Sequence, residues 1–265
     1  MKEIKIDELK KIQMDVLSRV HDFCICNNIK YSLGCGTLLG AVRHKGYIPW
    51  DDDIDIYMIR DEYNRFVEIF PETFQYIRLS SLERDKKWPR AYAQAYDIRT
   101  IMQDGSNEYQ VGVGIDVFPI DYVPEDELEW KSFNKRRKLL QNLYNMKCVG
   151  FRSGRSLYKN ILLAFFKLLL LPFSLRSLGE KIDEHARKFQ NKHTGFVFEN
   201  SQGSGLKNRF NAELFDNIIE IPFEDRMYRA FADFDNYLKN SYGDYMQLPP
   251  VEKRFSTHRF EAWWK

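Results

Sequence analysis

The sequence of 265 residues has little cysteine and almost no net charge. Its four cysteines, Cys24, Cys26, Cys35 and Cys148, include no pair separated by two residues, so the spacing indicates neither a zinc knuckle nor a disulfide framework. We therefore expect reduced thiols in a cytoplasmic protein. Forty basic and 38 acidic residues give a formal charge of +2, and this balance predicts no nucleic-acid binding.

Long hydrophobic runs are also missing. The first eleven residues are charged and contain no apolar region of the signal-peptide kind. The longest apolar stretch, Ile161 to Phe173, is interrupted by Lys167. As a helix it would reach roughly 20 Å, which is short of a bilayer core of about 30 Å. A transmembrane span is therefore not expected.

Two interpretations of this apolar stretch stay open. It could be a core helix of the second half of the chain. Alternatively, residues 152–176 could make a peripheral contact with the inner face of the cell membrane, where basic side chains would face anionic lipid. The basic residues in question are Arg152, Arg155, Lys159 and Arg176.

Hydrophobic periodicity predicts an α/β protein of the α+β kind, with a mixed sheet. Apolar spacings of three and four predict helices over 7–27, 37–44, 61–70, 125–147, 156–171, 175–190 and 229–240. Strands are predicted over 31–35, 54–58, 76–82, 91–102, 113–118 and 196–198. Pro119 and Pro124 indicate a break in regular secondary structure near the middle of the chain. We therefore expect a catalytic domain over 1–124 and a mostly helical region over 125–265.

The acidic run after Trp50 carries the strongest chemical signal. On a strand, residues two apart share a face, so Asp53 and Asp55 would present paired carboxylates, and Asp51 would extend the row if the strand began that early. Such carboxylates repel each other unless a cation neutralises them, and oxygen ligands suit Mg²⁺ or Mn²⁺. Asp116, flanked by Ile115 and Val117, offers a third carboxylate. The alternative for the triplet alone is an acidic turn facing solvent.

A glycine-flanked turn precedes the acids. Gly36 and Thr37 stand where a strand gives way to a helix, with Thr37 as a candidate cap, and such a turn lets phosphate approach backbone N–H groups. Arg43, His44 and Lys45 follow and could bind phosphate oxygens. A solvated basic turn is the alternative for these three, and a structural hydrogen bond is the alternative for His44.

These residues together resemble a known family. A Gly turn followed by spaced aspartates resembles the nucleotidyltransferase superfamily, and the longer run from Gly36 to Ile56 resembles the signature of the LicD family of phosphocholine transferases, which is related to the fukutin-type phosphoribitol transferases. Residues 116–121 resemble the second block of that family. A resemblance to its third block is found in Tyr242–Met246, Leu248–Arg254 and His258.

The resemblance implies a nucleotidyltransferase-like fold and transfer of phosphocholine from CDP-choline to a sugar hydroxyl of a cell-surface glycan of the teichoic acid or lipopolysaccharide type, with release of CMP. By the same resemblance, Mg²⁺ or Mn²⁺ at the diphosphate would be held by Asp53, Asp55 and Asp116. Phosphate would be bound by Gly36, Thr37, Arg43, His44 and Lys45. The base that takes the proton of the acceptor would be Asp116 or Asp51. Alternatives are transfer of phosphoribitol or phosphoglycerol, a nucleotidyltransferase that releases pyrophosphate, and a scaffold protein without catalysis.

Overall fold

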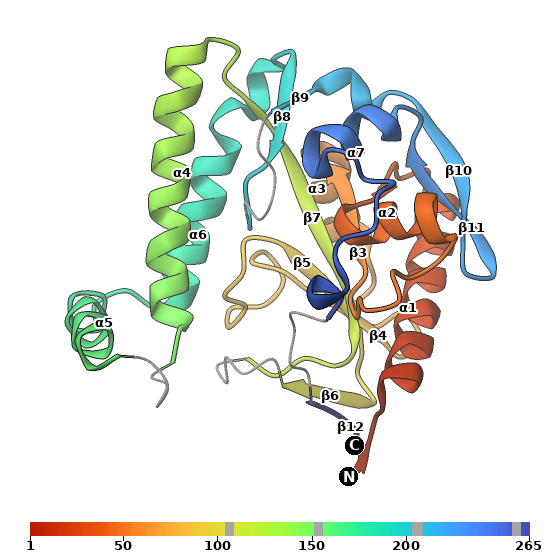
Figure 1. Ribbon diagram of the computed structural model, residues 1–265, viewed down its shortest axis with the longest axis horizontal. Helices are drawn as coiled ribbons and strands as arrows, with labels where there is room; N and C mark the ends of the chain where they lie inside the picture. Colours follow the sequence, from red (N-terminus) through yellow and green to blue (C-terminus); the bar gives the residue numbers. More distant parts are fainter. Residues whose placement is uncertain (104–108, 151–155, 203–208, 256–260) are drawn as a thin grey trace.

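The structure, a computed structural model, describes residues 1–103, 109–150, 156–202, 209–255 and 261–265 (Figure 1). The long strand β7 (Gly114–Val123) lies in the middle of a mixed seven-stranded sheet. Strand β3 (Asp55–Ile59) pairs with β7 in parallel, and β2 (Ser32–Leu33) pairs with β3 in antiparallel fashion. The remaining strands are β5 (Ala93–Asp97), which leads to β4 (Ile77–Ser80), and β8 (Phe196–Glu199), which leads to β9 (Phe210–Asn211).

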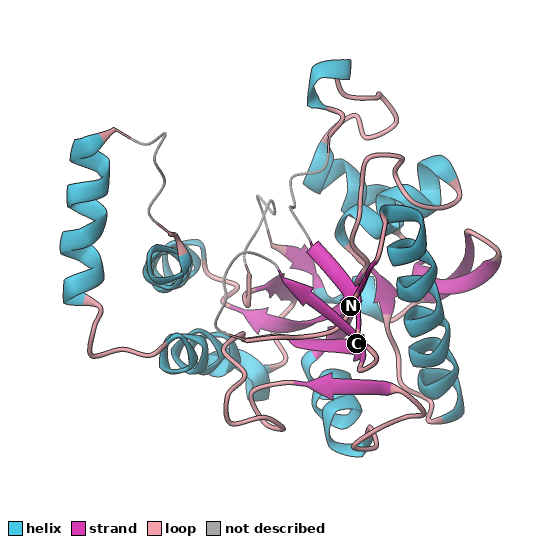
Figure 2. Ribbon diagram, turned by 90° about the horizontal axis from the view of Figure 1, so that it is seen from below, coloured by secondary structure: helices cyan, strands magenta, loops and turns pink. Residues whose placement is uncertain are grey.

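Helices pack around this sheet (Figures 1 and 2). Helices α1 (Ile6–Cys26) and α3 (Arg60–Ile69) pack against β7, and α2 (Cys35–His44) packs against β3. Helices α4 (Glu127–Cys148) and α6 (Leu175–Ala186) pack along each other, and α5 (Leu157–Leu169) contacts α4. The last α-helix is α7 (Phe234–Tyr242), and short 3₁₀ turns cover Arg187–Lys192, Ala212–Phe215 and Val251–Lys253.

Two smaller sheets complete the fold. Strands β1 (Lys2–Glu3), β12 (Glu261–Trp264) and β6 (Thr100–Gln103) form one of them, which brings the two chain termini together (Figure 1). Strands β10 (Ile218–Phe223) and β11 (Arg226–Phe231) form a hairpin. The α/β fold with a mixed sheet predicted from the sequence is therefore confirmed.

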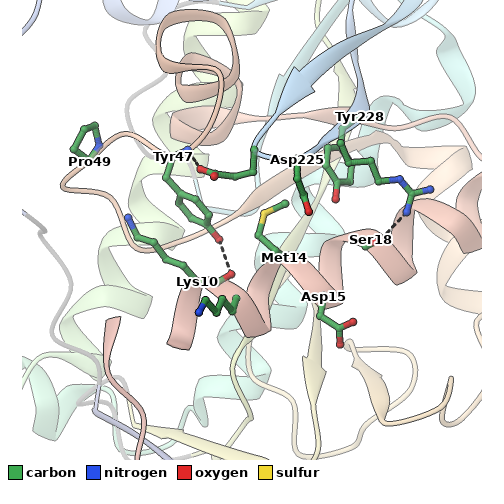
Figure 3. Close-up of a pocket in the computed structure, with 11 residues that line it drawn as sticks. Lys10, Met14, Asp15, Ser18, Tyr47, Pro49, Asp225 and Tyr228 are labelled. Atoms are coloured by element: carbon green, nitrogen blue, oxygen red, sulfur yellow. Dashed lines mark hydrogen bonds between the residues drawn. The ribbon is translucent and has the colours of Figure 1, made fainter. Parts of the chain in front are cut away.

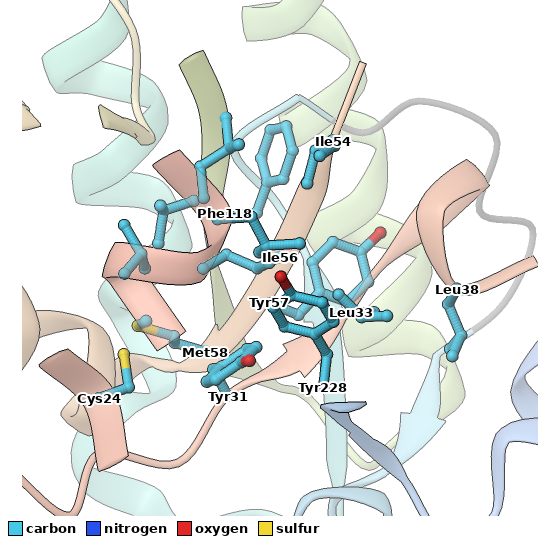
Figure 4. Close-up of a cluster of buried hydrophobic side chains, with 14 of the residues drawn as sticks. Cys24, Tyr31, Leu33, Leu38, Ile54, Ile56, Tyr57, Met58, Phe118 and Tyr228 are labelled. Atoms are coloured by element: carbon cyan, nitrogen blue, oxygen red, sulfur yellow. The ribbon is translucent and has the colours of Figure 1, made fainter. Parts of the chain in front are cut away.

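The main hydrophobic core encloses β3, which is buried on both faces. Ile56, Tyr57 and Met58 are each no more than 1% exposed, and Phe118 of β7 packs against the Tyr57 ring (Figure 4). Burial of an apolar side chain contributes about 1.5–3 kcal/mol to the free energy of folding. This core therefore holds the beginning of β3, where the acidic residues stand, in one position.

Several predicted elements have different boundaries in the structure. The single strand expected over 91–102 is two strands in different sheets, because the Asp97 side chain accepts hydrogen bonds from the backbone and side chain of Arg99 and turns the chain there. The helix expected over 229–240 begins only at Phe234, since residues 226–231 belong to the β10–β11 hairpin. Asp7 does not cap α1; Lys5 occupies that position, and Asp7 lies in the first turn.

Strand β7 extends beyond the predicted strand and contains Pro119. Strand β5 pairs with residues 114–117 of β7, and β8 pairs with residues 120–123. Pro119 therefore falls between the two stretches, where its lack of an N–H interrupts neither pairing. Because β8 belongs to 125–265 and β7 to 1–124, both parts of the chain contribute strands to the main sheet.

Helix α5 is not a core helix. Leu163 is the buried residue within it, whereas Ile161 and Phe165 are more than half exposed. The sequence-based alternative that placed this apolar stretch in the core is therefore wrong. Among the described residues, no helix combines the length and apolar character needed to cross a membrane.

Candidate active site

Two of the predicted acids lie side by side in the main sheet. Asp55 begins β3, and Asp116 is the third residue of β7; the two strands are parallel neighbours, and their register pairs Asp55 with Asp116. Paired residues of neighbouring strands project on the same face of a sheet. The fold therefore brings together two carboxylates that are 61 positions apart in the sequence (116 − 55).

The electrostatics of Asp55 confirm that the acids are close. Burial raises the pKa of Asp55 well above its ordinary value, and the negative charges of Asp53 and Asp116 raise it further. A hydrogen bond from the Cys35 thiol opposes part of this rise. Carboxylates this close together in a partly buried place destabilise one another when they are ionised.

The remaining acids precede the strand instead of lying on it. Asp51, Asp52 and Asp53 form a loop in which one carboxylate oxygen of each lies within 4.8 Å of the others. The alternation expected from Asp51 onward does not apply, because β3 begins only at Asp55. Burial and the charge of Asp53 raise the pKa of Asp51 to about 7. Asp52 belongs to this group although it was not predicted as a site residue. Its position between Asp51 and Asp53 could have indicated it.

Gly36 makes room for Asp51. A Cβ atom at position 36 would lie 2.5 Å from Oδ2 of Asp51, which is closer than real Cβ contacts. Gly36 belongs to the first turn of α2, whose N-cap is Gly34. The first backbone N–H groups of a helix have no partner within the helix and favour anions. The Asp51 carboxylate and the start of α2 therefore share one small space.

Thr37 has a different role from the predicted one. Gly34 is the N-cap of α2, and Thr37 Oγ1 accepts a hydrogen bond from the backbone N of Asp55 at 2.9 Å. The backbone N of Gly34 in turn donates to the Asp55 carbonyl oxygen at 2.9 Å. Helix α2 is thereby tied to the first residue of β3 on both sides, and these contacts position Asp55.

A network of hydroxyl and thiol groups lies behind Asp55. Cys35 Sγ and Tyr57 Oη are 2.8 Å apart, and Tyr237 Oη donates to Tyr57 Oη at 3.3 Å. The backbone N of Cys35, which has a left-handed φ of 42°, donates to Tyr237 Oη. Burial raises the pKa of the Cys35 thiol, so the thiol stays protonated and can donate to a carboxylate. Helix α7 is thus connected to the start of α2.

The predicted phosphate-binding residues divide into two groups. Gly36 and Thr37 lie at the beginning of α2, beside the acids. Arg43, His44 and Lys45 lie at its other end, about 9–14 Å away along the helix axis. Lys45 is the exposed C-cap, and its carbonyl oxygen accepts a hydrogen bond from the backbone N of Glu224.

Arg43 faces a cavity of about 700 Å³ between α2 and the C-terminal segment. Its Nη1 donates to the Tyr245 carbonyl oxygen at 2.7 Å, and burial together with the nearby charge of Arg254 lowers its pKa. Arg254 lies 5.6 Å from the Trp50 ring, which His44 meets edge-on at 6.2 Å. Trp50, Tyr242, Asp244, Tyr245 and Arg254 line this cavity.

The cavity and the acids are neighbours. Trp50 directly precedes Asp51. Burial of the Tyr242 hydroxyl raises its pKa, and the negative charges of Asp55 and Asp51 contribute to that rise. The sequence reasoning did not select Tyr242 or Arg254 as site residues. Both residues belong to the stretch that resembles the third block of the family, so this resemblance could have identified them as site residues. His258 lies outside the described residues.

A second cavity, of about 830 Å³, is lined in part by Tyr47 and Pro49, in the loop that leads to the acids (Figure 3). Helix α1, Tyr47 and the turn of the β10–β11 hairpin form its walls. Tyr47 Oη donates to the Gln13 side-chain oxygen at 3.0 Å, and the Gln13 amide donates to the Asp52 carbonyl oxygen at 2.9 Å. These contacts support the acidic loop from behind.

Asp121 is a structural residue. Its carboxylate accepts two hydrogen bonds from Arg60, at 2.5 and 2.9 Å, and both side chains are no more than 1% exposed. Arg60 also pairs with Asp183 of α6 at 3.0 Å. The pair joins β7, α3 and α6, so Asp121 is neither a turn cap nor part of the acidic group.

Carboxylates on neighbouring strands of a mixed sheet, close to the first turn of α2, are the arrangement expected of a nucleotidyltransferase-like fold. A family profile described as LicD/FKTN/FKRP, nucleotidyltransferase domain, matches residues 28–152. Along 99% of both chains, the protein is 32% identical to the lipopolysaccharide cholinephosphotransferase LicD of Haemophilus influenzae (strain ATCC 51907 / DSM 11121 / KW20 / Rd). The chain belongs to the LicD family, and the expectation that it is a transferase enzyme is confirmed.

Shorter similarities involve two uncharacterised proteins. The chain is 41% identical over 73 residues to one of Rickettsia typhi (strain ATCC VR-144 / Wilmington), covering 27% of this chain and 24% of that protein. It is 38% identical over 85 residues to one of Rickettsia prowazekii (strain Madrid E), covering 32% of each.

Proposed function

We propose that this protein transfers phosphocholine from CDP-choline to a sugar hydroxyl of a lipopolysaccharide-type glycan and releases CMP. The observation that carries the proposal is the meeting of Asp55 and Asp116 on β3 and β7, beside Asp51 and Asp53. The full-length similarity to a lipopolysaccharide cholinephosphotransferase supports the choice of phosphocholine and of the acceptor. A teichoic acid is the alternative acceptor.

The donor set fits a hard divalent cation. Asp53, Asp55 and Asp116 offer carboxylate oxygens alone, which suit Mg²⁺ or Mn²⁺, and their mutual repulsion shows in the raised pKa of Asp55. We propose that these three residues hold the ion. When bound, the ion would neutralise charge on the diphosphate of the donor.

The chain's own residues would bind and orient the donor. The N–H groups of the first turn of α2, at Gly36 and Thr37, are suited to phosphate oxygens. Arg43 supplies a positive charge in the cavity that adjoins the acids. Trp50 and Tyr242 offer aromatic surfaces there for a cytosine ring or a trimethylammonium group.

The acceptor hydroxyl must lose its proton when it attacks phosphorus. Asp51 and Asp116 are the two carboxylates that we propose for this step. Asp51 lies in the acidic loop and Asp116 pairs with Asp55, and a base has to be within hydrogen-bond reach of the hydroxyl. No covalent enzyme intermediate is proposed, since phosphoryl transfer depends chiefly on positioning and on charge stabilisation.

Mass spectrometry of the products tests the proposal. The protein is incubated with Mg²⁺, a truncated lipopolysaccharide acceptor and, in turn, CDP-choline, CDP-ribitol and CDP-glycerol. We expect CMP and an acceptor heavier by one phosphocholine, with CDP-choline the best donor. Preference for another CDP-alcohol would assign a different phospho-alcohol, and pyrophosphate from a nucleoside triphosphate would indicate a nucleotidyltransferase. Turnover of none of these donors, by protein that is folded, would favour a scaffold role.

A further inference from the structure

Helix α5 presents an apolar face to the outside of the molecule. Seven large side chains of this helix are between 51% and 77% exposed, and at about 100° per residue they fall within an arc of roughly 140°. We define this set as the α5 outer face. It consists of Leu157, Tyr158, Ile161, Leu162, Phe165, Leu168 and Leu169.

The orientation of α5 is fixed by contacts on its inner side. Lys147 Nζ of α4 donates to the carbonyl oxygen of Leu170, the C-cap of α5, at 2.9 Å. Lys167 Nζ of α5 donates to the Lys147 carbonyl oxygen, in the last turn of α4, at 3.1 Å. Each lysine thus satisfies carbonyls at the end of the other helix, where a positive charge is favourable. Leu163, on the opposite side of α5, is buried, so the apolar face is held outward.

The segment of the chain from 130 to 179, which contains α5, carries charged side chains of one sign. Between Glu129 and Glu180 the sequence contains no acidic residue, although 38 occur in the whole chain. The same fifty residues, 130–179, contain eleven basic ones. They are Lys131, Lys135, Arg136, Arg137, Lys138, Lys147, Arg152, Arg155, Lys159, Lys167 and Arg176.

Not all of these cations are available to a partner. Arg176, which the sequence suggested for lipid contact, donates to the backbone carbonyls of Leu82, Asp85 and Trp88 and pairs with Glu180. It joins α6 to the 82–88 segment, so it is no lipid contact. Lys159, by contrast, is exposed on α5 at the border of the outer face.

We infer that the α5 outer face binds the surface of an anionic phospholipid bilayer, with α5 lying in the plane of the interface. An apolar face on a helix that lies in a basic segment of the chain and carries the exposed Lys159 matches such a surface in both respects. A second copy of the chain is a poorer occupant, because a symmetric contact would place two all-basic segments against each other. An acidic protein surface would satisfy the charge but not seven adjoining apolar side chains.

Vesicle flotation with the full chain tests this inference. One set of vesicles contains phosphatidylglycerol and phosphatidylethanolamine, and the other contains phosphatidylcholine alone. We expect binding to the anionic vesicles. Ile161→Glu/Phe165→Glu should reduce the partition coefficient at least about 100-fold, since two apolar side chains and two charges are changed. Leu128→Glu/Leu139→Glu, at exposed leucines of α4, is the matched control and should bind like the wild type.

Three results would overturn the inference. One is unchanged vesicle binding by Ile161→Glu/Phe165→Glu. Another is equal binding to neutral and anionic vesicles. The third is a lipid-free dimer, seen by sedimentation velocity, that the same double variant dissociates. Turnover of CDP-choline with a soluble acceptor should be unchanged in this variant, so the test is independent of the proposed transfer reaction.

Discussion

Thr37 Oγ1 accepts a hydrogen bond from the backbone N of Asp55, and this contact joins the first turn of α2 to the first residue of β3. Thr37→Val should leave that buried N–H without its acceptor and cost about 1–3 kcal/mol in the free energy of unfolding. It should also lower kcat at least about tenfold, because Asp55 loses its support. Urea unfolding and steady-state kinetics measure the two effects. Thr37→Ser keeps the oxygen and serves as the control; equal losses in both variants would contradict this role.

Gly36 admits the Asp51 carboxylate, and an added methyl group would occupy the same space. Gly36→Ala should displace Asp51 and reduce kcat/KM on the order of 100-fold, while circular dichroism shows an intact fold. Gly150→Ala is the matched control, because nothing lies within 4 Å of a Cβ there. Wild-type activity in Gly36→Ala would show that the position of Asp51 does not matter for turnover.

The sequence was sufficient for the acidic pair but not for its surroundings. Asp55 lies within an alternating apolar stretch, and Asp116 lies between Ile115 and Val117, so strand placement and a shared site could be predicted locally. Which strands are neighbours is a long-range property. The sequence did not predict that β3 and β7 pair in parallel, and this pairing is a finding of the fold.

Other features could not be predicted because they depend on contacts between distant segments. The β10–β11 hairpin turns at Glu224, whose left-handed φ of 56° is unusual for that residue, so no local turn signal marked it. Tyr237 reaches Tyr57 across 180 positions. The exposure of α5 could not be predicted either, because an apolar sequence does not show which other segments pack against it.

Arg60 and Asp121 form a buried ion pair that joins β7 to α3. Asp121→Asn should lower the free energy of unfolding by about 3–5 kcal/mol, since the Arg60 guanidinium would stay buried with Asp183 as its remaining carboxylate. Urea denaturation measures this change. The exposed pair of Asp22 and Arg226 is the control, and Asp22→Asn should cost less than about 1 kcal/mol. A loss of that small size in Asp121→Asn would be inconsistent with the pair as described.

The buried His185 should make the free energy of unfolding sensitive to acid. Burial lowers its pKa, and its Nε2 donates to the Phe133 carbonyl oxygen at 3.0 Å. Because the folded pKa lies below the unfolded value of about 6.5, the contribution of His185 is present above that pH and is lost as the pH falls. The free energy of unfolding of the wild type, relative to that of His185→Gln, should therefore decrease from pH 7 to pH 5. Identical pH slopes would rule out this cause.

Divalent ions should stabilise the protein through the acidic group. The melting temperature should rise with added MgCl₂ or MnCl₂, because binding to the folded state shifts the unfolding equilibrium. Asp55→Asn should abolish most of this rise, whereas Asp235→Asn, on the exposed surface of α7, should keep it. An equal rise in both variants would place the ion elsewhere.

The most direct measurement compares CMP release from CDP-choline by the wild type and by Asp116→Asn, with Mg²⁺ and acceptor present. Asp116→Asn keeps the size of the side chain and removes its charge. We expect at least about a 1,000-fold loss of kcat/KM, which corresponds to about 4 kcal/mol, with the melting temperature of the metal-free protein preserved or raised. Turnover by folded Asp116→Asn within about twofold of the wild type would contradict the proposed role of the Asp116 carboxylate.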